Sequence, residues 1–152
     1  MSANPTEVFN DWERVCKDSP YVIYVAEVPE DSALVYDEYG TMEPFVVLYF
    51  GGPIPSASDR GIVSAKYDTT ILHLTVECYA ARSEDSRAIK GYFIDKLLGH
   101  VSVDEEGTTL ASELSFLASG QYTRASNTVR PTQYIDAVAF ECRSNLSQEC
   151  VI

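Results

Sequence analysis

The residue types that most often carry chemistry are scarce in this chain. Its 152 residues include two histidines, His73 in a strand-like run and His100 just after a helical one. Neither has a cysteine or an acid at the sequence spacing of metal ligands, so we expect structural or solvated roles for both. The four cysteines are far apart and form no CxxC pair: Cys16, Cys78, Cys142 and Cys150. We predict no zinc site, and free thiols in a reducing compartment.

Two other kinds of pattern could bind phosphate or a hard cation. Gly51-Gly52-Pro53 lacks the GxxxxGK[ST] pattern of a phosphate loop, and we expect its glycines to allow positive φ where a strand turns. Three acidic groups, at 30–31, 84–85 and 104–106, do not follow the EF-hand pattern. The sequence therefore predicts no catalytic, cofactor-binding or metal-binding residue, no cofactor and no enzymatic activity.

The net charge of −12 is unevenly distributed. Residues 1–50 carry −8, residues 51–103 carry 0 and residues 104–152 carry −4. Tight binding to nucleic acid needs clustered lysine and arginine, so we expect no adhesive contact with DNA. The sequence has no secretory signal and no apolar run of about 18 residues, which indicates synthesis in the cytoplasm and no membrane partner.

Two helices are expected. The first begins at Pro5, with Asn4 as a capping residue, and ends before Pro20. Val8, Trp12 and Cys16 fall on its apolar stripe. The second spans 83–98, with Ser83 as N-cap and Gly99 at the C′ position.

Four or five strands are expected from β-branched and aromatic runs. Residues 45–50 are apolar on both faces, which fits a strand covered on both sides or lying at a subunit contact. Residues 70–80 alternate, with the Leu72 and Leu74 face as core and the face of His73 and Tyr79 half exposed or against another subunit. Further strands are expected at 21–28, at 133–143 and, from an ambiguous pattern, at 110–117.

Three connections separate these elements. Residues 33–42 are expected to form a loop or short edge segment, and residues 51–68 and 119–132 to form long loops. The whole predicts one α+β domain over 1–152, with a mostly antiparallel sheet of four to five strands packed against two helices. Its core spans about 5–143, and 144–152 form a C-terminal tail.

With the elements in this order, the chain resembles the tail terminator (tail completion) proteins of long-tailed bacteriophages that infect actinobacteria. The resemblance covers about 21–143 and rests on 44–50, Gly51-Gly52-Pro53, Asp59-Arg60-Gly61, the strand at 72–80, the helix at 87–98 with Gly99, and the strand at 131–143. It implies a hexameric ring in the virion that caps the tail tube, stops its polymerisation and joins the tail to the head connector protein. DNA passes through such a ring as cargo, and no catalysis or cofactor is implied. The acids of 33–42 match no feature of the family.

The expected interface combines the apolar strand, the long loops and exposed aromatic side chains, since tyrosine is common at protein interfaces. Its candidate residues are Phe45, Val47, Tyr49, Gly52, Pro53, Asp59, Arg60, Tyr79, Arg124 and Arg130. For the tyrosines, a core position with the hydroxyl reaching water is an equal alternative. Other function classes also stay open: a head-tail connector or tail tube subunit, a non-viral binding module, or a small enzyme that uses acids in a pocket.

Overall fold

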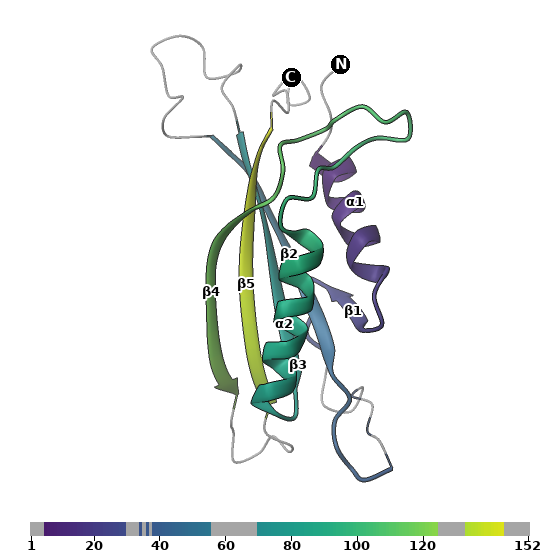
Figure 1. Ribbon diagram of the computed structural model, residues 1–152, viewed down its shortest axis with the longest axis vertical. Coiled ribbons are helices and arrows are strands. Elements are labelled where there is room, and N and C mark those ends of the chain that lie inside the picture. Colours follow the sequence, from purple (N-terminus) through teal and green to yellow (C-terminus); the bar gives the residue numbers. More distant parts are fainter. Residues whose placement is uncertain are drawn as a thin grey trace.

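The computed structural model describes residues 5–29, 34, 36, 38–55, 70–124 and 133–144. They form two helices, α1 (Pro5–Lys17) and α2 (Ser83–Leu97), and five strands, β1 (Val22–Val25), β2 (Phe45–Pro55), β3 (Thr70–Ala80), β4 (Ser115–Arg124) and β5 (Gln133–Ser144). Both helices lie on the same face of one twisted sheet (Figure 1). The predicted α+β class is confirmed.

The strands lie in the order β1-β2-β3-β5-β4. Three of the four ladders are antiparallel, and only β1 runs parallel to the strand beside it, with Val22 opposite Phe45 and Val25 opposite Leu48. β1 is shorter than the predicted 21–28 because Ala26, at φ 57, turns the backbone out of the extended region. The two outer strands of the sheet are therefore β1 and β4.

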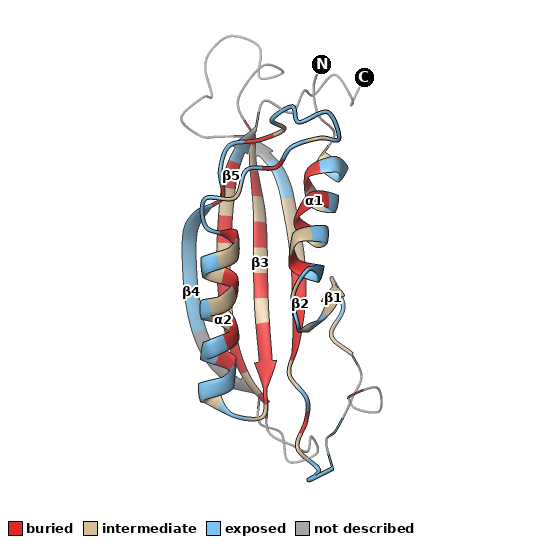
Figure 2. Cartoon of the chain, turned by 45° about the vertical axis from the view of Figure 1, so that its right-hand side comes forward, coloured by how far each residue is buried: buried red, intermediate tan, exposed pale blue. Residues whose placement is uncertain are grey.

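The main core lies between the helices and the sheet. Trp12 of α1, Phe93 of α2 and Phe140 of β5 are its largest side chains, and all three are fully buried. The alternation predicted for β3 holds, because Thr70 and each second residue from Leu72 to Ala80 are buried against the helices (Figure 2). Gly99 takes φ +82 directly after the helix C-cap Leu98, as predicted for a C′ glycine.

A second, smaller apolar cluster covers one end of the opposite sheet face. It joins Leu34 and Met42, from the crossover between β1 and β2, to Phe45, Val47, Tyr79 and Ile135. Phe45 and Tyr79 are cross-strand partners whose rings stack with centroids 4.6 Å apart. The start of β2 is thus covered on both faces within the subunit. The sequence allowed this arrangement or a position at a subunit contact. Tyr79 is buried, unlike its half-exposed neighbours on that face of β3.

Three predicted boundaries were wrong. β2 continues to Pro55 through a bulge between Gly51 and Ile54, where Gly52 takes φ +96, so the glycines shape the strand instead of ending it. β4 occupies 115–124, most of which the sequence assigned to a loop, because a strand at a sheet edge needs no apolar alternation. Ser83 is the first residue of α2 and Arg82 the N-cap, with no side-chain capping bond; Ser83 instead offers its carbonyl to Ser86 Oγ, 3.0 Å away.

Candidate assembly interface

The outer strand β4 is the most exposed regular element among the described residues. It pairs with β5 only, in a ladder with a bulge between Phe116 and Ala118. Every side chain from Ser115 to Gly120 is exposed, on both faces of the strand (Figure 2). Phe116 and Leu117 are about half accessible to solvent. A long edge strand with apolar side chains in water is a surface that proteins normally cover.

More apolar side chains gather beside this strand. The chain between α2 and β4 folds back on itself, because Gly99 N donates to Leu114 O at 2.9 Å and Leu110 N donates to Ser102 O at 2.8 Å. This brings the exposed residues after α2 to the start of β4. Three of the eight large hydrophobic side chains that the described residues expose lie near the start of β4: Leu98, Phe116 and Leu117. Val101 and Val103 lie farther along the hairpin between α2 and β4, which reaches across to α1 (Figure 1). We call Leu98, Phe116 and Leu117 the β4-side surface.

The opposite end of the sheet exposes a different set of side chains. Its large apolar members are Val22 of β1, and Tyr36 and Tyr39 of the crossover to β2. Three acids are exposed among them: Glu27, Glu38 and Glu43. We call these six residues the β1-side surface. Because three strands lie between β1 and β4, these two outer strands are separated by roughly 19 Å across the sheet, at about 4.8 Å for each of four steps.

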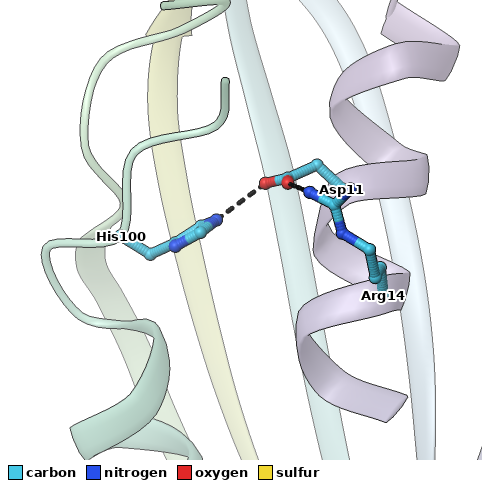
Figure 3. A network of polar contacts seen from close by, with 3 residues as sticks. All are labelled: Asp11, Arg14 and His100. Carbon is cyan, nitrogen blue, oxygen red and sulfur yellow. Dashed lines mark hydrogen bonds and ion pairs between the residues drawn. The ribbon is translucent and has the colours of Figure 1, made fainter. Parts of the chain in front are cut away.

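A polar contact ties the segment that follows α2 to α1. His100 Nε2 lies 2.7 Å from Asp11 Oδ2, and Arg14 bonds the other carboxylate oxygen of Asp11 (Figure 3). The side chain of Asp11 is 4% exposed, so these two partners compensate a buried carboxylate. The sequence missed this contact because the two residues are 89 positions apart. Its prediction of a structural role for His100 agrees with this geometry.

A second buried polar network holds α2 against the sheet. Lys90 Nζ lies 2.8 Å from Asp136 Oδ1, and Ser86 Oγ donates to Asp136 Oδ2 at 3.1 Å. The Asp136 side chain is inaccessible to solvent, which makes a substrate contact there impossible without opening the core. Across the described ranges, no group of three or more histidine, cysteine or acidic residues could hold a metal ion.

The described cysteines are free and buried: Cys16, Cys78 and Cys142. Burial raises the pKa of the Cys16 thiol to about 12 and that of Cys142 to about 12, and it raises the pKa of Cys78 as well. These thiols stay protonated at neutral pH and behave as small apolar side chains, as predicted for Cys78 and Cys142.

The structure separates the predicted interface residues into three groups. Phe45, Val47 and Tyr79 come together on one sheet face but are buried in the subunit, with Tyr49 half-buried beside them. Gly52 and Pro53 are exposed at the β2 bulge, and Arg124 ends β4 opposite Gln133. Asp59, Arg60 and Arg130 lie outside the described residues.

Sequence reasoning missed the β4-side surface altogether. The charge pattern does not mark it either, because residues 114–135 contain no acid but Asp104, Glu105, Glu106 and Glu113 come just before them.

No protein-family model matches the chain, and no curated protein sequence matches it. No helix in the described part of the chain is long and apolar enough to span a membrane.

Proposed function

We propose that this chain is a structural virion protein, a tail terminator whose copies form a ring. The ring, a hexamer in the family that the sequence resembles, caps the tail tube, ends its polymerisation and joins the tail to the head connector. The proposal takes its biological setting from that resemblance. Its structural support comes from the arrangement of exposed surfaces on one subunit.

The observation that carries the proposal is the pair of unlike surfaces at the two ends of the sheet. A ring subunit meets one neighbour with one surface and the next neighbour with another, which is a heterologous contact that closes on itself. The β4-side surface is apolar, with Phe116 and Leu98 exposed, and the β1-side surface is acidic, with Tyr39 exposed among glutamates. Such a subunit is suited to bind copies of itself at both ends.

The overall acidity fits a ring through which DNA passes. A net charge of −12 repels phosphates, so the nucleic acid slides through and is not held. Purified protein is therefore expected not to retain double-stranded DNA on a filter at moderate salt. Tight retention would contradict this part of the proposal.

The direct test combines the purified chain with a phage that lacks it. Sedimentation and electron microscopy of the protein are expected to find closed rings of a single size. Long tubes would instead indicate a tail tube subunit, because a tube protein keeps polymerising whereas a terminator assembles only into a closed ring. A phage deleted for the gene is expected to make tails of uncontrolled length that do not join heads, and normal virions from that phage would refute the proposal.

The enzyme alternative predicts a different result. Acidic residues alone can catalyse hydrolysis, but they need a pocket in which their pKa values are displaced. Turnover of a small molecule, lost on substitution of an acid in one subunit, would favour this class over a ring protein.

A further inference from the structure

We draw no further inference here: the strongest candidate, the exposed outer edge of strand β4 with Phe116 and Leu117 near its start, carries no proposal because nothing in the structure shows what covers it.

Discussion

The ion pair between α2 and β5 gives the sharpest stability prediction. Lys90→Met removes the ammonium group that lies 2.8 Å from Asp136 Oδ1 and keeps a side chain of similar length. Asp136 is fully buried, whereas 21% of the Lys90 side chain is exposed, so the variant removes the ammonium group and leaves the carboxylate in the core, where Ser86 Oγ still donates to Asp136 Oδ2. Loss of one partner of a buried pair typically costs about 3–5 kcal/mol. The partial exposure of Lys90 places the expected loss near about 3 kcal/mol.

Reversible urea denaturation followed by circular dichroism measures this loss. For a domain of this size, about 3 kcal/mol corresponds to a fall in Tm of roughly 6–12 °C. The double variant Lys90→Met with Asp136→Asn is expected to be less destabilised than the sum of its single variants, by about 2 kcal/mol, because no unpaired charge remains. A matched control is Lys17→Met, which removes an exposed pair with Glu13 and is expected to cost under about 0.5 kcal/mol.

Three results would refute this reasoning. A loss below about 1 kcal/mol for Lys90→Met would mean that water or another group compensates the buried carboxylate. Strictly additive costs for Lys90 and Asp136 would mean that the two side chains do not interact in solution. A change in the slope of the free energy of unfolding against urea concentration, without a shift of the midpoint, would indicate an altered unfolded or native ensemble and not a lost ion pair.

Three more predictions concern the core, the α1 contact and the thiols. Phe93→Ala is expected to cost about 4 kcal/mol in urea denaturation, because a fully buried ring leaves a cavity, while Phe93→Leu costs clearly less. His100→Ala is expected to cost about 1–2 kcal/mol and to speed amide exchange in α1, more than Arg14→Ala does, because Arg14 is largely exposed. The folded-state pKa values of about 12 for Cys16 and Cys142 keep both thiols protonated below that pH, so their alkylation at neutral pH is expected only on unfolding. Peptide mass spectrometry locates the label, because Cys150 lies outside the described residues, and labelling of Cys16 or Cys142 in the folded chain would contradict their burial.

The elements that the sequence predicted well are those whose environment matches their local pattern. β3 was placed at its observed bounds because one face is uniformly buried, so its apolar residues alternate without interruption. α2 was placed within one residue of its end because Gly99 marks the stop and Ile89, Phe93 and Leu97 form one buried stripe.

The elements it missed depend on distant partners. β4 carries polar and small residues because its outer side meets water, and only pairing with β5 makes it a strand. The smaller apolar cluster on the sheet face opposite the helices includes isolated residues such as Leu34 and Met42, and no periodic pattern in the sequence predicts their burial. The bond from His100 to Asp11 joins residues that are 89 positions apart in the sequence, so no pattern of local spacing could predict it. The local sequence pattern therefore predicted the central strand β3 and the helix α2, whereas the edge strand β4 depends on pairing with a strand distant in the sequence.

The parallel pairing of β1 has a mechanical consequence. The first twenty-five residues reach the rest of the sheet through one long crossover, while β2, β3, β5 and β4 are held to one another by antiparallel ladders. Release of α1 and β1 as a unit would leave the register of those four strands intact, but it would also expose Val8, Trp12 and Cys16, which are fully buried in the main core. Such release would also uncover the β2 edge from Phe45 to Leu48, where the β1 of a second copy would then find the same pairing partners. Strand exchange of this kind would link two copies by contacts that each already makes internally.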